Sequence, residues 1–314
     1  VGAREGRQER RVRVEVFAAK RVDEARADNP HEARGHHHIR GEAGDSLGQG
    51  RIPGRPIRVG LEVHHECGNP GGGGAFHPER PRAVGADGAW MRERLAGYGV
   101  GVDLLDEVDE TSGHAVIALD AAGENQIILY PGANLLIEEA RLAAGLAAGK
   151  TGDIAVCQNE TSAQVAFAHA ARMAGMRVAY AAAPFTVDAV RDILPEIDLL
   201  LLNAVEAEQL ETAMGMPLTG LDVRDIVVTL GAEGCRWIDT ISGDSRHFPT
   251  PEVKVVDTTG AGDTFTGYLL AALDQGMEMD AALHLALRAG AVMVTRLGTA
   301  DVIPTQAEIA EFFA

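Results

Sequence analysis

The chain of 314 residues has little cysteine and no long apolar run. Its three cysteines, Cys67, Cys157 and Cys235, lie far apart and form no CxxC pair, so there is no disulfide framework and a reducing compartment is favoured. No apolar stretch approaches the roughly 20 residues that a membrane-spanning helix needs. The Arg-rich start also lacks the apolar segment of a secretory signal. We therefore expect a soluble cytoplasmic protein with no membrane partner.

Positive charge is scarce over most of the chain, and its distribution changes near Val84. Residues 1–84 carry 15 Lys and Arg against 12 Asp and Glu, whereas residues 85–314 carry 13 against 34, a net charge of −21. A surface this acidic repels a phosphate backbone, which argues against a nucleic-acid partner. An anionic nucleotide would need a metal ion or backbone amides beside it, and a Mg²⁺-dependent site would meet that need.

Residues 1–84 form an Arg-, Gly- and His-rich segment with little patterning for a core. Arg11–Ala18 alternates like a half-buried strand, but the rest of the segment offers little to pair with it. The run His36–His38 lacks further ligands at metal spacing, and Gly71–Gly74 fits a flexible linker better than an anion loop. We expect this segment to be disordered, and two origins stay open: out-of-frame translation of a GC-rich gene, or a genuine extension.

From Val84 onward, apolar strands alternate with helices, which predicts a parallel sheet covered on both faces. A hairpin is expected first, over residues 114–119 and 126–130, with a turn at 120–123. The further expected strands are 153–157, 177–182, 199–202 and 226–230, and the expected helices are 162–173, 187–194, 206–214, 262–273, 281–296 and 306–313. Ligands of such folds bind at the carboxyl ends of the strands.

The strongest chemical signal is the segment Asp257–Phe265, DTTGAGDTF, which follows an apolar run and leads into a helix. Gly260, Ala261 and Gly262 are small enough for a phosphoryl group to approach the amides at the helix N-terminus. Asp263, in the first turn, could take a proton from an alcohol. The alternative is that Asp263 only caps the helix and that the glycines form a turn.

This segment resembles the C-terminal signature of the ribokinase family of carbohydrate kinases, the PfkB type. Further similar motifs follow the family order: Gly123–Asn125 with Pro131–Asn134, Asn203-Ala-Val-Glu206, and Thr229-Leu-Gly231 with Gly234. The resemblance covers about residue 84 to the C-terminus. It implies a ribokinase-like α/β fold, with a doubly wound, mostly parallel sheet flanked by helices. A small β lid is also implied, and it is incomplete if residues 1–84 contribute no strands.

The resemblance implies a kinase mechanism in which ATP donates its γ-phosphoryl group to a sugar hydroxyl. Asp263 would be the base, and the amides of residues 260–262 would stabilise the transferring group. Asn203 and Glu206 would organise Mg²⁺ through water molecules. From the residues alone, Asn203 can equally be a turn residue and Glu206 a helix-start acid.

Nucleotide and K⁺ sites are implied as well. Thr229, Gly231 and Gly234 would contact the nucleotide, although they also fit a tight strand-to-strand turn. The implied K⁺ ligands are Asp257 and Thr259, with the backbones of Met293, Arg296 and Gly298. Val302 departs from the family pattern, because ribokinases tend to have a hydroxyl there.

Sugar recognition is where the sequence departs most from the family. The early Asp and the G-G-K-G-x-N motif of ribokinases do not occur, and only Glu160 matches a sugar-contacting acid. Glu160 can equally be the N-terminal residue of the next helix. Ribose, giving ribose 5-phosphate, is the first expectation, and fructose, ketodeoxygluconate and nucleosides follow it. An inactive relative that binds nucleotide or sugar stays open, as does a homodimer formed through the lid.

Overall fold

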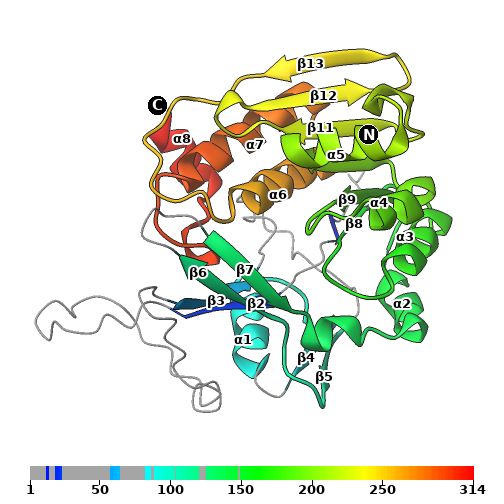
Figure 1. Ribbon diagram of the computed structural model, residues 1–314, viewed down its shortest axis with the longest axis vertical. Coiled ribbons are helices and arrows are strands. Elements are labelled where there is room, and N and C mark those ends of the chain that lie inside the picture. Colours follow the sequence, from blue (N-terminus) through cyan, green and yellow to red (C-terminus); the bar gives the residue numbers. More distant parts are fainter. Residues whose placement is uncertain are drawn as a thin grey trace, which may run out of the picture.

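A computed structural model of the chain describes residues 12–13, 18–22, 57–63, 82–85, 88–102, 104–119, 125–147 and 149–314. The histidine run, the glycine run and the hairpin turn discussed above lie outside the described residues. Figure 1 shows one large sheet with helices around it and a smaller sheet set apart from it.

The large sheet has seven strands in the order β1-β8-β9-β10-β11-β12-β13. Their bounds are β1 Val12–Arg13, β8 Ile154–Gln158, β9 Arg177–Ala181, β10 Leu199–Asn203, β11 Asp225–Thr229, β12 Cys235–Asp239 and β13 Asp244–Phe248. The first five strands are parallel, and β12 and β13 are antiparallel. The run of leucines in β10 suits a strand that is covered on both faces. The sequence did not predict β12 and β13: β13 is almost wholly exposed and polar, and β12 mixes buried with half-buried residues of both polar and apolar kinds.

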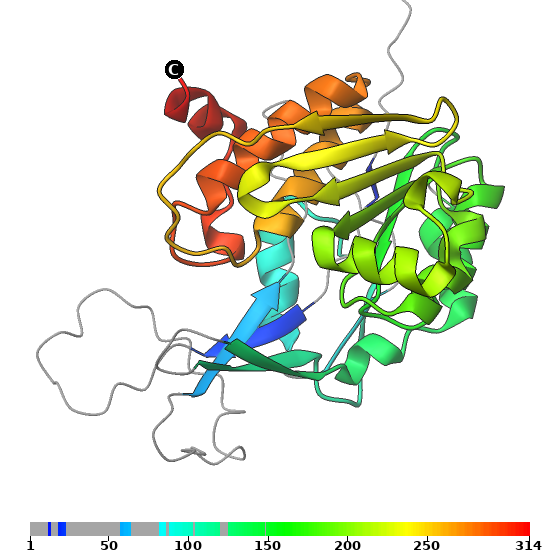
Figure 2. The same ribbon diagram turned by 45° about the horizontal axis from the view of Figure 1, so that its top comes forward.

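Helices cover both faces of this sheet (Figure 2), which confirms the expected α/β architecture. Along β8, Ile154 and Val156 face one core, whereas Ala155 and Cys157 face the other. The first core is closed by α1 Ala89–Gly97, α6 Ala261–Asp274, α7 Met279–Met293 and α8 Gln306–Phe312. The second is closed by α2 Glu139–Leu146, α3 Gln164–Met173, α4 Val187–Ile193 and α5 Ala204–Met214. Among the residues described, no helix combines the length and the apolar character needed to cross a membrane.

Two smaller sheets and several short 3-10 helices complete the described elements. One sheet has the order β2-β3-β6-β7, from strands Ala18–Val22, Ile57–Val63, His114–Leu119 and Asn125–Tyr130, and the other pairs β4 Arg82–Gly85 with β5 Leu105–Val108. The 3-10 helices are η3 Gly132–Leu135, η4 Leu194–Glu196, η5 Leu218–Gly220, η6 Gly231–Glu233 and η7 Ala300–Val302. The pairing of β6 with β7 confirms the predicted hairpin.

The segment before residue 84 supplies strands to both larger sheets, which differs from the sequence-based expectation. No partner was foreseen for Arg11–Ala18, yet β1 pairs in parallel with β8 and β2 pairs with β3. Strand partners so distant along the chain leave no local pattern, so the pairing could not be derived from periodicity. The division of the chain at residue 84 stays a prediction.

The edge of the parallel region carries a buried acid, Asp225, at the start of β11. Burial raises the pKa of this carboxyl group, while the hydrogen bond from Trp237 Nε1 to Oδ1, 2.9 Å long, opposes the shift. A raised folded-state pKa means that the protonated acid favours folding below its ordinary pKa. That contribution is lost as the pH rises through the folded-state pKa.

We therefore expect Asp225→Asn to gain in stability relative to the wild type as the pH rises from about 3 to about 7. Asn keeps the carbonyl acceptor for Trp237 but carries no charge to desolvate. Melting temperatures of both proteins across that pH range test this. A melting temperature of Asp225→Asn that falls or stays constant relative to that of the wild type as the pH rises would contradict it.

Candidate active site

The predicted site residues gather at the carboxyl edge of the parallel strands. Gln158, Asn203 and Thr229 end β8, β10 and β11, and Asn203 and Thr229 are register partners. Helix α6 begins at the same edge, as a hydrogen bond shows: Gln158 Nε2, at the end of β8, donates to Asp263 Oδ1 in the first turn of α6 over 3.4 Å. The structure therefore brings the candidate base to the edge that also carries the candidate Mg²⁺ and nucleotide residues.

The N-terminus of α6 has the geometry of an anion site. Its N-cap residue is Gly260, in the left-handed region at φ +75°, and Thr264 N donates to Gly260 O over 2.9 Å. Ala261 N donates to Thr258 O over 3.3 Å. Gly262 and Asp263 follow in the first turn, where N–H groups point toward the N-terminus of the helix. These two amides and the helix dipole can therefore meet an anion.

Asp263 is the third helical residue of α6, and its side chain is half-buried. The cap position belongs to Gly260, so the alternative in which Asp263 is the N-cap residue is wrong. A carboxylate at this position stands next to the first-turn amides and at the end of β8. That placement suits a proton acceptor for a group held at the helix terminus.

Gln158 is a site residue that sequence reasoning did not single out. It is only 4% exposed, although it ends a strand whose other residues are apolar and buried. A buried amide side chain is costly without hydrogen bonds, and this one faces Asp263. The signal in the sequence was a polar residue at the end of an apolar strand.

Glu160 lies two residues beyond β8, half-buried in the loop that leads to α3. The alternative in which it begins the next helix is wrong, because α3 starts at Gln164 with Ala163 as its N-cap. Its place at the carboxyl edge agrees with the role of a sugar-contacting acid, which stays a prediction.

Asn203 and Glu206 form a reciprocal capping box at the start of α5. Glu206 N donates to Asn203 Oδ1 over 2.9 Å, and Asn203 N donates to Glu206 Oε2 over 2.7 Å. The helix-start alternative is therefore confirmed for Glu206, whereas Asn203 is not a turn residue, because it ends β10 and is the N-cap of α5. Burial raises the pKa of Glu206, and the hydrogen bond from the Asn203 backbone opposes that shift.

The same pair also fits a Mg²⁺ ion held through water. Mg²⁺ usually keeps several waters and takes one or two carboxylates together with substrate phosphates. Glu206 caps the helix through one carboxylate oxygen, and Asn203 is exposed at the strand end. Within the described part of the chain, no three acidic, His or Cys side chains are grouped to hold a metal directly. An indirect mode is the one that these residues support.

The predicted nucleotide residues lie in a tight turn between β11 and β12, as the structural alternative required. Leu230 N donates to Gly234 O over 2.8 Å, and Gly234 N donates to Gly231 O over 3.1 Å. A Cβ added at Gly231 would meet no atom within 4 Å, so this side of the turn is open to a ligand. Thr229 lies at its start, beside Asn203 in the sheet. The turn and the capping pair are therefore neighbours.

The predicted K⁺ residues are joined mainly to one another. Asp257 Oδ1 accepts from Thr259 N at 2.9 Å and from Thr259 Oγ1 at 2.7 Å, and Asp257 Oδ2 accepts from Gly298 N at 3.4 Å. Met293 O accepts from Arg296 N at 3.1 Å. Helix α7 ends at Met293 rather than at residue 296, which places Arg296 in the following loop.

The fold defines the class, an α/β protein with helices on both faces of a mostly parallel sheet and with the N-terminus of α6 at the carboxyl ends of the strands. The model of the pfkB family carbohydrate kinases matches residues 82–306. The chain belongs to this family of phosphotransferases.

Relatives and solved structures agree with this assignment. The ribokinase of Haemophilus influenzae is 30% identical over 252 residues, which cover 73% of this chain and 79% of that protein. The crystal structure of ribokinase from Cryptococcus neoformans var. grubii in complex with ADP is 29% identical with a TM-score of 0.68, covering 81% and 90% of the two chains. Arabidopsis thaliana ribokinase, complexed with ribose and ATP, is 27% identical with a TM-score of 0.65, covering 74% and 80%. A deoxyribokinase from Salmonella typhi is 26% identical over 237 residues, which cover 70% and 76%.

Proposed function

We propose that the chain phosphorylates ribose with ATP and releases ribose 5-phosphate and ADP. The observation that carries this proposal is the placement of Asp263 in the first turn of α6, beside the amides of that turn and at the carboxyl edge of the sheet. The ribokinases among the similar proteins support the choice of sugar.

The reaction needs a base, an anion site and a held nucleotide. The sugar hydroxyl oxygen bonds to the γ-phosphorus, the bond from that phosphorus to the β,γ-bridging oxygen breaks, and the hydroxyl proton passes to Asp263. The amides of Gly262 and Asp263 face the transferring group. Mg²⁺, when bound near Asn203 and Glu206, neutralises charge on the phosphates. Gln158 orients the Asp263 carboxylate through its hydrogen bond.

The proposal is tested by measuring ADP release from the purified chain with ATP, Mg²⁺ and a panel of acceptors. The panel contains ribose, 2-deoxyribose, fructose, ketodeoxygluconate and nucleosides. We expect the highest kcat/KM with ribose. A tenfold higher value with another acceptor would replace ribose, and it would leave the assignment as a kinase in place.

A second candidate function is binding of nucleotide or sugar without turnover. It is favoured by the absence of the early Asp and the G-G-K-G-x-N motif, and by a family match that begins only at residue 82. A protein of this kind would gain thermal stability with ADP or ribose and yet release no ADP from ATP with any member of the panel.

The Mg²⁺ assignment predicts different outcomes for the two residues of the capping box. Glu206→Gln keeps an acceptor for the Asn203 amide but loses its charge, so we expect little change in stability and a roughly 10- to 100-fold loss of Mg²⁺ affinity or activity. Asn203→Ala also removes the cap, so it should cost about 1 kcal/mol of stability in addition. Mg²⁺ titrations of activity and melting curves measure the two effects separately.

Thr305→Ala is the matched control, because it removes the same kind of capping box from α8. It should lower the melting temperature as Asn203→Ala does and leave the Mg²⁺ titration unchanged. Wild-type Mg²⁺ titrations for both Glu206→Gln and Asn203→Ala would restrict this pair to a structural role.

A further inference from the structure

The loop between α7 and α8, residues 294–305, lies against the segment that precedes the anion site. Val294 O accepts from Val256 N at 2.7 Å and from Asp257 N at 3.2 Å. Further along, Gly298 N donates to Asp257 Oδ2 over 3.4 Å. Asp257 in turn fixes Thr259 through two hydrogen bonds. The loop therefore supports the backbone immediately before Gly260.

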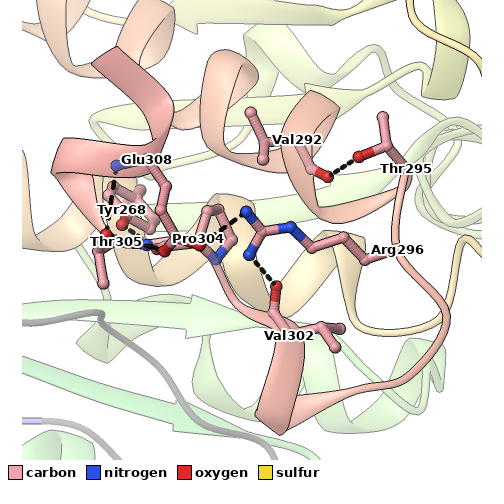
Figure 3. Close-up of polar contacts among 8 residues, drawn as sticks. All are labelled: Tyr268, Val292, Thr295, Arg296, Val302, Pro304, Thr305 and Glu308. Carbon is pink, nitrogen blue, oxygen red and sulfur yellow. Dashed lines mark hydrogen bonds and ion pairs between the residues drawn. The ribbon is translucent and has the colours of Figure 1, made fainter. Parts of the chain in front are cut away.

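Arg296 connects the two ends of this loop through its side chain (Figure 3). Its Nη1 donates to Val302 O over 3.0 Å, and its Nη2 donates to Glu308 Oε1 over 2.9 Å. One guanidinium thus joins the start of the loop, the end of the loop and α8. The two contacts use two different nitrogens of the planar guanidinium, and lysine, which has a single nitrogen, does not reproduce that geometry.

The far end of the loop is held on two helices. Glu308 Oε2 accepts from the backbone and side chain of Thr305, which forms the capping box of α8. The buried Tyr268 of α6 donates its hydroxyl to Pro304 O (Figure 3). Tyr268 belongs to α6, the helix whose first turn carries Asp263. The loop is therefore anchored to α6 and α8 at one end and to the signature segment at the other.

We propose that Arg296, acting with Glu308, is a positioning residue for phosphoryl transfer. Its two hydrogen bonds hold the loop at the place where Gly298 N reaches Asp257, and Asp257 holds the backbone that presents the first-turn amides. The inference rests on the proposed function, because it requires the transferring group to meet those amides. Exposed ion pairs add little to stability, whereas a small misplacement of catalytic groups lowers the rate strongly.

Three single variants of the full chain test the proposal. Arg296→Met removes both contacts, and Glu308→Gln keeps the capping acceptor but turns an amide toward Arg296. Both should lower kcat about 10-fold with little change in the KM for sugar. Thr305→Ala removes the side-chain part of the α8 cap but keeps the contact of Thr305 N with Glu308 and the contact of Arg296 with Glu308. It should therefore lower the melting temperature and leave kcat unchanged. The double variant Arg296→Met with Glu308→Gln should lower kcat no more than Arg296→Met alone, because the two residues act as one unit.

Hydrogen exchange gives a readout that does not depend on activity. Amides of residues 256–263 should exchange faster in Arg296→Met and in Glu308→Gln than in the wild type, and at the wild-type rate in Thr305→Ala. Wild-type exchange in both Arg296→Met and Glu308→Gln would overturn the proposal. If the wild type phosphorylates no acceptor of the panel, the proposed function fails, and the exchange measurement still decides whether Arg296 holds the signature segment.

Discussion

Asp263→Asn is expected to lower kcat by on the order of 10² to 10⁴, the usual effect of losing a general base. Asn has nearly the shape of Asp and can still accept from Gln158, but it cannot take the proton of the sugar hydroxyl. Asp263 is not the N-cap of α6, so the loss of charge in the first turn should change stability by only about 0.3 to 1 kcal/mol. Nucleotide affinity should persist, because the turn at residues 229–234 and the first-turn amides are unchanged.

Asp280→Asn supplies the control, because Asp280 occupies the first turn of α7 and forms an ion pair with Arg246 of β13, two strands away from β11. It should leave kcat unchanged. Steady-state rates, ADP affinity and melting temperature are measured on the same preparations. An Asp263→Asn protein that retained more than about a tenth of the wild-type rate would be too active for the assigned base.

The largest expected effect on stability comes from Gly234→Ala. Gly234 has φ +96°, and a Cβ at this position would stand 2.0 Å from Phe248 O, a backbone atom of the neighbouring strand. The substitution therefore adds backbone strain to a collision that only a shift of backbone can relieve. We expect a loss of about 3 kcal/mol or more, which corresponds to a fall in melting temperature of roughly 6 to 12 °C in a domain of this size.

Gly231→Ala is the matched substitution in the same turn. Gly231 has φ +59°, and a Cβ there would meet no atom within 4 Å, so only the left-handed strain of about 1 to 2 kcal/mol applies. Its melting temperature should fall much less than that of Gly234→Ala, while nucleotide affinity should fall if ATP lies on the open side of the turn. Equal melting temperatures for the two variants would contradict the steric argument.

The parallel core could be predicted from the sequence because each of its strands is a short, nearly continuous apolar run. Strands β8 to β11 and helices α3 to α6 lie within a few residues of their expected positions. Strand β13 gave no such signal, since its outward-facing polar residues are typical of an exposed edge. The partner of β1 lies about 140 residues further along, where only the tertiary fold determines the pairing.

In the candidate site, too, some residues could be predicted from the sequence and others could not. Asp263 and the glycines before it could be predicted, because a small-residue turn followed by an acid has a local chemical meaning at a helix start. Gln158 could not be assigned to the site, since its partner belongs to a distant helix. The role of the Arg296 side chain could not be predicted either. The sequence predicted a helix through residue 296, whereas α7 ends at Met293. Arg296 therefore lies in the following loop, and its guanidinium contacts Glu308 of α8.

The two side chains that form the capping box of α5, Asn203 and Glu206, are also the candidate Mg²⁺ residues. A descendant of this protein that abandoned catalysis would still need Asn203 and Glu206 to begin α5. Their persistence would therefore say little about whether such a descendant works as an enzyme. The loss of Asp263, which does not cap its helix, would be the informative change.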